Sequence, residues 1–290
     1  MKFILLTLVF ILSLQAEKIL LINSNSNVEK YREVVKSFGE DFKQEFKTID
    51  ISNMRQDEIK EYLYDEYPDI VYAVGNKAYQ YAHKYLPEKK IFFSSIVNWE
   101  RLPLQGERFG ISNELHTGIQ LTLITSYFKE IKTISVIYST YTADLAQGFK
   151  ENSEQMGINI VAHKMEDTES TDFDSLIKSS DAHIIIPDPV LLSNEEAIQQ
   201  LFSASRKYKK PIFAYDDLFI PYGAVLISAV DNPTIGRQMA LILKEHLSNK
   251  VTAKIHSPIG THIIFNKKEA AHLGVDFDKH ILSITTKTIE

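Results

Sequence analysis

The sequence predicts an α/β fold of two lobes, each a doubly wound parallel sheet, joined by hinge crossovers. Short apolar runs alternate with segments whose apolar residues recur every three or four positions, as expected for buried parallel strands separated by amphipathic helices. The pattern restarts after Glu114, so two runs of about 100 residues follow each other. Because no Gly/Ser-rich or Pro-rich linker separates them, we expect short hinges between the lobes.

Length and composition support a globular protein with more than one core. The chain has 290 residues, and single cores tend to split beyond roughly 250 residues. Its hydrophobic fraction of 44% and charged fraction of 24% exclude intrinsic disorder. Lys and Arg number 32 against 38 acidic residues, which argues against a nucleic-acid-binding surface. The absence of Cys excludes disulfides, cysteine nucleophiles and thiolate zinc sites.

Residues 1–16 have the pattern of a secretory signal peptide. Lys2 precedes the apolar run 3–14, and the small residue Ala16 follows it. The run is shorter than the roughly 20 residues that a spanning helix needs, although a buried first strand or an uncleaved anchor remains the alternative. We therefore expect cleavage after Ala16 and a periplasmic location in a Gram-negative bacterium.

In the first lobe, five strands alternate with three helices. The strands are expected at 18–22, 46–51, 69–74, 90–94 and 109–112. The helices are expected at 28–42, 53–67 and 76–86. Ser26 and Glu29 have the spacing of a capping box, and Asn53 is the expected N-cap of the second helix.

The second run predicts further strands and helices in the same alternation. The strands are expected at 133–138, 158–163, 182–187, 211–215 and 224–228. The helices are expected at 115–128, 143–156, 173–178, 193–208 and 233–247. Ser193 is the expected first residue of a capping box with Glu196, and Asn232 is the expected N-cap before Pro233.

Common catalytic and metal-binding motifs are absent from the sequence. It contains no G-x-S-x-G elbow, phosphate-binding loop, G-x-G-x-x-G or H-E-x-x-H motif. Its nine histidines are scattered, and no two stand three or four positions apart, as a helical zinc pair requires. A three-histidine site assembled across the fold is the remaining alternative. We expect neither an enzyme nor a metal or other cofactor.

Polar residues follow the predicted strands of the first lobe. Ligands of doubly wound sheets bind at the carboxyl ends of strands, and a strand that turns into a helix offers free N–H groups to an anion. Hydroxyl and amide groups in such loops suit a small polar ligand, although helix capping and turn formation explain the same residue types. The candidate residues here are Ser24, Gly75, Asn76, Lys77, Ser94, Ser95 and Asn98.

Acids and tyrosines follow the strands of the second lobe. A carboxylate there can bind a ligand ammonium through a charge-assisted hydrogen bond, and a tyrosine adds an apolar face with a polar tip. Each acid can equally be a helix cap. The candidate residues are Tyr138, Ser139, Tyr141, Asp188, Tyr215 and Asp216. We expect the two sets to face each other across a cleft between the lobes.

Several segments resemble motifs that occur in this order in one family. They are Val74–Ala78, similar to I-G-T-x-A; Ile91–Asn98, similar to V-F-x-x-V-x-D-P; Arg108–Ser112, similar to N-I-T-G-x-S; Pro211–Asp216, similar to P-V-F-x-x-D; and Asn232–Gln238, similar to Y-x-x-L-G-R-Q. Over residues 17–280 the chain resembles ABC-transporter substrate-binding proteins with a type I periplasmic-binding fold, including tryptophan- and tyrosine-type binders. Asn76 and Asn98-Trp99 depart from these motifs, so the ligand need not be that of the relatives.

The resemblance implies three crossings between the lobes, near Asn113, Ala229 and Gly260. The N-terminal lobe would then comprise 17–113 and 230–260, and the C-terminal lobe 114–229 and 261–290. It also implies a monomeric periplasmic solute-binding protein that closes around a small ligand and presents it to the permease of an ABC importer. An amino acid or similar zwitterion is the expected ligand, with its carboxylate at the helix start near Gly75 and its ammonium at Asp216 or Asp188. The alternative is a ligand sensor that signals to a membrane kinase or chemoreceptor.

Overall fold

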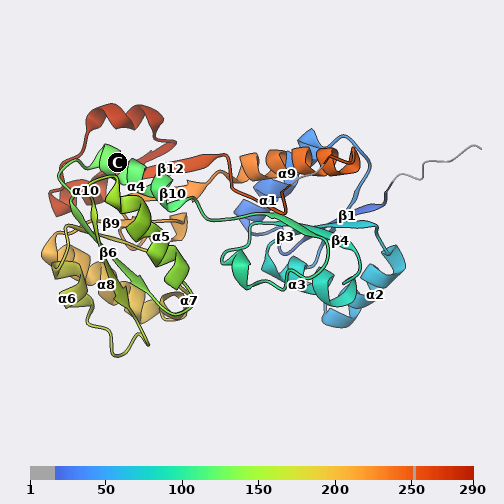
Figure 1. Ribbon diagram of the computed structural model, residues 1–290, viewed down its shortest axis with the longest axis horizontal. Helices are drawn as coiled ribbons and strands as arrows, with labels where there is room; N and C mark the ends of the chain where they lie inside the picture. Colours follow the sequence, from blue (N-terminus) through green and yellow to red (C-terminus); the bar gives the residue numbers. More distant parts are fainter. Residues whose placement is uncertain (1–16, 251–252) are drawn as a thin grey trace, which may run out of the picture.

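The computed structural model describes residues 17–250 and 253–290 and has two lobes, each built on its own sheet (Figure 1). The strand order is β11-β5-β4-β3-β1-β2 in the first sheet and β13-β12-β10-β9-β8-β6-β7 in the second. The predicted α/β class with two sheets is confirmed. The predicted signal peptide lies outside the described residues. Within the described ranges, no helix is long and apolar enough to cross a membrane.

The N-terminal lobe has a wholly parallel sheet between two helix layers. Its strands are β1 (Ile19–Asn23), β2 (Lys47–Asp50), β3 (Ile70–Val74), β4 (Lys90–Ser94), β5 (Arg108–Ile111) and β11 (Ile255–His256). All residues of β1 and β3 are buried, because both faces of these strands are covered. One face packs against α1 (Glu29–Asp41) and α9 (Asn232–Leu247), and the other against α2 (Gln56–Glu66) and α3 (Asn76–Tyr85).

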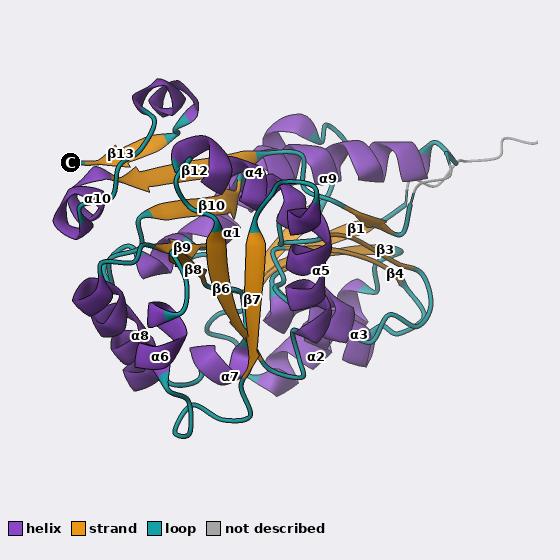
Figure 2. Cartoon of the chain, turned by 60° about the vertical axis from the view of Figure 1, so that its left-hand side comes forward, coloured by secondary structure: helices purple, strands orange, loops and turns teal. Residues whose placement is uncertain are grey.

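The C-terminal lobe has a mixed sheet, also covered on both faces (Figure 2). Its strands are β6 (Thr133–Tyr138), β7 (Asn159–Lys164), β8 (Ala182–Ile184), β9 (Ile212–Ala214), β10 (Leu226–Val230), β12 (Thr261–Asn266) and β13 (Lys287–Ile289). α4 (Thr117–Tyr127), α5 (Ala143–Glu154) and α10 (Lys267–Leu273) cover one face. α6 (Phe173–Lys178), α7 (Pro189–Leu192) and α8 (Glu195–Tyr208) cover the other. β12 runs antiparallel to β10, and the other strand pairs of this sheet are parallel, so the sheet is mostly parallel, as predicted.

The chain passes between the two sheets after β5, after β10 and after β11. The second and third connections are bonded to each other, since the Asp231 N–H donates to the Gly260 carbonyl at 3.1 Å. α9 returns to the N-terminal lobe and packs closely on α1: a Cβ added to Gly236 would lie 2.3 Å from the Val34 carbonyl oxygen. We propose the division into lobes that the sequence suggested, because these connections lie beside the expected crossings.

The predicted helix caps were wrong, although each predicted helix and strand has a counterpart. The Ser26 N–H donates to Asp50, and α1 begins after Val28 instead. α2 has Arg55 as its N-cap. Asn194 and Asp231 cap α8 and α9, in each case one residue from the prediction. The sequence did not indicate the short α7, nor β11, β12, α10 and β13. A long-range bond therefore replaces the predicted cap of α1, whereas α8 and α9 are capped by a neighbouring residue of the same local type.

Candidate functional site

At the N-terminal lobe's strand ends, most predicted ligand-binding groups support the loops themselves. Ser24 Oγ accepts a hydrogen bond from the Ala78 N–H at 2.9 Å, which satisfies one donor at the start of α3. Gly75 precedes this helix with a φ of +86°, and a Cβ there would lie 2.7 Å from Ser24 Oγ. Lys77 Nζ donates to the Ile51 carbonyl at 2.6 Å, so its charge is directed at the β2–α2 loop. Asn76, at the first turn of α3, is exposed.

The loop after β4 contains one core group and two strained residues. The Ser94 and Tyr72 hydroxyl oxygens lie 2.7 Å apart in the core, and Ser94 is fully buried. Ser95 and Asn98 have positive φ values of 60° and 55°. Ser95 Oγ is buried without a hydrogen-bond partner. Such backbone strain is often found at binding sites, which keeps this loop a candidate.

Asp188 was predicted to bind the ligand, but in the structure its carboxylate binds groups of the protein itself. Its Oδ2 accepts hydrogen bonds from the Ser139 N–H and Oγ, each at 2.7 Å, and from the Thr142 hydroxyl. Its Oδ1 accepts from the Val190 and Leu191 N–H groups at the start of α7. The carboxylate is completely buried and its acceptor positions are occupied. Asp188 therefore has no acceptor position left for a ligand ammonium, contrary to the prediction. Ser139, another predicted ligand-binding residue, is one of its hydrogen-bond donors.

Asp216 contacts a cation from the opposite lobe. Its Oδ2 lies 3.5 Å from Lys30 Nζ on α1, and its Oδ1 accepts from the Leu218 N–H at 3.1 Å. The neighbouring Tyr215 lies in a small cavity between the lobes, and burial raises the pKa of its hydroxyl. Tyr138, at the end of β6, is half-buried and packs on the core of the C-terminal lobe.

A cavity of about 450 Å³ lies between the lobes. Its walls come from the loop after β4, the connection after β5, the start of α5 and the segment around β11. Of the predicted residues it brings together Asn98 and Tyr141, from opposite lobes. The Arg101 guanidinium stands over the Tyr141 ring at 4.3 Å from its centroid, a cation–π contact across the cavity. The volume is within the usual range for small-ligand sites.

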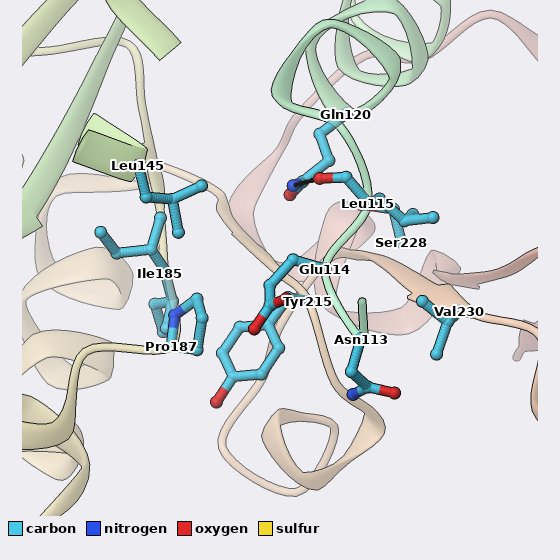
Figure 3. A pocket seen from close by; sticks show the side chains of 11 residues that line it. Asn113, Glu114, Leu115, Gln120, Leu145, Ile185, Pro187, Tyr215, Ser228 and Val230 are labelled. Atoms are coloured by element: carbon cyan, nitrogen blue, oxygen red, sulfur yellow. Dashed lines mark hydrogen bonds between the residues drawn. The ribbon is translucent and has the colours of Figure 1, made fainter. Parts of the chain in front are cut away.

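Glu114 borders both this cavity and a smaller one of about 10 Å³, which is room for about one water molecule. Figure 3 shows its side chain next to the Tyr215 ring at the centre of the smaller cavity, with Pro187 opposite. Glu114 Oε1 accepts a hydrogen bond from the Asn98 N–H at 2.5 Å, whereas Oε2 is buried without a partner. Burial, and secondarily repulsion from Glu100, raises the pKa of the Glu114 carboxyl from 4.5 to about 7.

Glu114 and Arg101 were missed by the sequence analysis. Both stand beyond the end of a strand, Arg101 after β4 and Glu114 after β5, where a charged residue was the usable signal. In the part of the chain that the structure describes, no three His, Asp or Glu side chains are grouped as metal ligands. One arginine, four carboxylates, Trp99 and Tyr141 line this cavity, so the arrangement is suited to noncovalent binding of a small polar molecule.

Comparisons with known proteins bear on the family and the fold. The family model for ABC transporter substrate binding protein matches residues 39–289. The fold is similar to a Clostridium difficile substrate binding protein in its ligand-free, open form (TM-score 0.72, 14% identity, 94% of this chain and 100% of that one). It is also similar to a Streptococcus pneumonia ABC domain in complex with L-Trp (TM-score 0.62, 17% identity, 94% and 100%). A periplasmic ribose ABC transporter protein from Conexibacter woesei has a TM-score of 0.57 at 10% identity (89% and 95%). No curated protein matches the sequence.

Proposed function

Because this chain belongs to the family of ABC transporter substrate-binding proteins, we propose that it captures a small zwitterion, such as an amino acid, between its lobes and delivers it to an ABC permease. The family is one of binding proteins that act outside the cytoplasm, and its fold is the type I periplasmic-binding fold. Neither the family nor the similar structures supports the alternative role as a sensor.

One observation carries the proposal: the cavity of about 450 Å³ has walls from both lobes and from two connections between them. A ligand bound there touches both lobes at once, so it binds the closed arrangement better than an open one. Binding energy is thereby converted into closure, because a ligand shifts a conformational equilibrium by its difference in affinity for the two states. The closed arrangement is what a permease would recognise.

The zwitterionic class is supported by the charges around the cleft. Arg101 and Glu114 line the cavity, and Asp216 and Lys30 face each other nearby from opposite lobes. The similar protein from Streptococcus pneumonia is in complex with L-Trp, which carries one charge of each sign at neutral pH. Trp99 and Tyr141 line the cavity and would pack against an apolar or aromatic side chain.

Thermal unfolding in the presence of each of the twenty L-amino acids tests the ligand class. A ligand present at 100 times its dissociation constant should stabilise the folded protein by about 2.7 kcal/mol. Small-angle X-ray scattering of the same samples should show a smaller radius of gyration for the stabilised ones, because closure brings the lobes together.

The matched control is Asp174→Asn, which breaks an exposed ion pair with Lys207 on the C-terminal lobe. This variant should respond to the same amino acids as the unaltered protein. The absence of stabilisation by every amino acid would overturn the zwitterion proposal, and stabilisation without compaction would overturn the closure mechanism.

A further inference from the structure

The carboxylates near the cleft differ in the partners that they already have. Asp188 accepts five hydrogen bonds, and Asp216 is paired with Lys30. Glu114 makes no ion pair with any described residue. A buried carboxylate without a cation is costly, and natural proteins usually neutralise such groups. Of these three groups, Glu114 is the one with neither a cation partner nor hydrogen bonds to both oxygens.

Glu114 lies between the two lobes, at the border of the larger cavity. It belongs to the connection between β5 and α4, and its carboxyl lies between the loop after β4 and Tyr215 of the opposite lobe. One oxygen, Oε1, is held by the Asn98 N–H, which fixes the orientation of the group. The other, Oε2, is buried and has no partner. Glu114 lines the larger cavity, so Oε2 is the acceptor left for a ligand that enters while the cleft is open.

A cation for the opposite end of a zwitterion lines the same cavity. Arg101 forms no ion pair with a described residue, and its guanidinium is held over the Tyr141 ring. A guanidinium in this position can still donate through its edge, because the cation–π contact uses its face. Arg101 and Glu114 thus supply one donor group and one acceptor group around a space that is large enough for an amino acid.

We propose that Glu114 and Arg101 bind the two charged ends of a zwitterionic ligand, the ammonium at Glu114 Oε2 and the carboxylate at the Arg101 guanidinium. This assignment rests on the proposed function and moves the ammonium site from Asp216 and Asp188 to Glu114. No covalent bond changes. The ligand ammonium provides the cation that the protein lacks at this carboxylate, and Trp99 and Tyr141 provide apolar contacts for the rest of the molecule.

Binding of an ammonium at Glu114 should release a proton from this carboxyl, which can be measured. Since burial raises the pKa of Glu114 to about 7, much of this carboxyl is protonated at pH 6.5, and an arriving ammonium displaces that proton. Other ionisable groups around the two cavities remain in place when Glu114 is altered, so a control for their titration is built into the comparison. They are Glu100, Arg101, His116, Tyr141, Asp144, Glu151, Tyr215 and His256.

The test uses isothermal titration calorimetry of the full protein with L-tryptophan and then with each of the other amino acids. Glu114→Gln keeps an oxygen for the Asn98 N–H but carries no charge, so the affinity for the bound amino acid should fall about 10- to 100-fold. Titrations at pH 6.5 in two buffers of different ionisation enthalpy should show proton release by the unaltered protein and none by the variant. Glu196→Gln, on the exposed side of α8, should change neither quantity.

Ligand analogues that lack one of the two charged groups test the Glu114 and Arg101 contacts separately. The affinity for the des-amino analogue of the bound amino acid should not change on Glu114→Gln. The affinity for the amino-acid amide, which lacks the carboxylate, should not change on Arg101→Gln. If an amino acid binds and Glu114→Gln leaves either its affinity or the proton release unchanged, the assignment is wrong while the proposed function stands. If no amino acid binds at all, the proposed ligand class and this assignment both fail.

Discussion

The Asn98 side-chain amide donates a 2.9 Å hydrogen bond to the Pro187 carbonyl, which joins the two lobes. Asn98 follows β4 of the first sheet, and Pro187 follows β8 of the second. The backbone N–H of the same Asn98 binds Glu114 in the connection between the lobes. One residue therefore contacts the first lobe, the hinge segment and the second lobe. Its left-handed backbone, with a φ of 55°, is a conformation that Asn tolerates better than most residues.

Loss of this amide should favour wider separation of the lobes. Asn98→Gly keeps the left-handed backbone without strain and removes only the side-chain bond. A hydrogen bond contributes about 0.5–1.5 kcal/mol, so the equilibrium between joined and separated lobes should shift roughly 2- to 10-fold. Small-angle scattering of the ligand-free variant should show a larger radius of gyration than that of the unaltered protein.

Asn249→Gly is the matched control for this change, because Asn249 has a φ of 54° at the end of α9, away from Pro187. The control should leave the radius of gyration as it is. An equal radius for Asn98→Gly and the unaltered protein would mean that the Asn98–Pro187 contact does not hold the lobes together.

Glu114 should make the stability of the protein depend on pH. Its folded pKa of about 7 is above the ordinary 4.5, so its favourable contribution is present below pH 4.5 and is lost as the pH rises towards 7. Glu114→Gln should therefore be more stable than the unaltered protein at pH 8, by about 1 to 3 kcal/mol, with little difference at pH 5. Urea unfolding at both pH values measures this. A difference that is the same at pH 5 and pH 8 would show that the folded carboxyl has an ordinary pKa.

Gly75 should tolerate no side chain. Gly75→Ala would place a Cβ 2.7 Å from Ser24 Oγ and 2.8 Å from Tyr31 Cζ, in addition to the cost of a φ of +86°. Gly157→Ala shares a positive φ of +66° but has no atom within 4 Å of the added Cβ. The backbone cost is about 1–2 kcal/mol at Gly157. At Gly75, whose ψ of 163° puts it in a region that almost only glycine adopts, it is about 1–3 kcal/mol, and crowding adds about 1–3 kcal/mol more. Equal losses of unfolding free energy for the two variants would show that the Ser24 loop moves aside without cost.

The order of strands and helices could be predicted from the sequence because burial periodicity is local. Residues 133–138 and 90–94 form β6 and β4 with the predicted bounds, since both strands are covered on two faces and read as apolar runs. The antiparallel β12 was not predicted, because strand direction depends on where the chain re-enters the sheet. The helix caps also failed, since neighbours such as Asp50 compete for the same N–H groups.

The sequence by itself determined the fold class, the order of the strands and helices up to α9 except the short α7, and the kinds of polar residue that follow the strands. Only the tertiary structure decided which of those polar groups are available. Ser139 donates a hydrogen bond to Asp188, which is 49 positions away in the sequence, whereas Glu114 retains one oxygen without a hydrogen-bond partner. The physical reason is that a hydrogen bond occupies a donor and an acceptor together, so the capacity left for a ligand depends on contacts between distant segments.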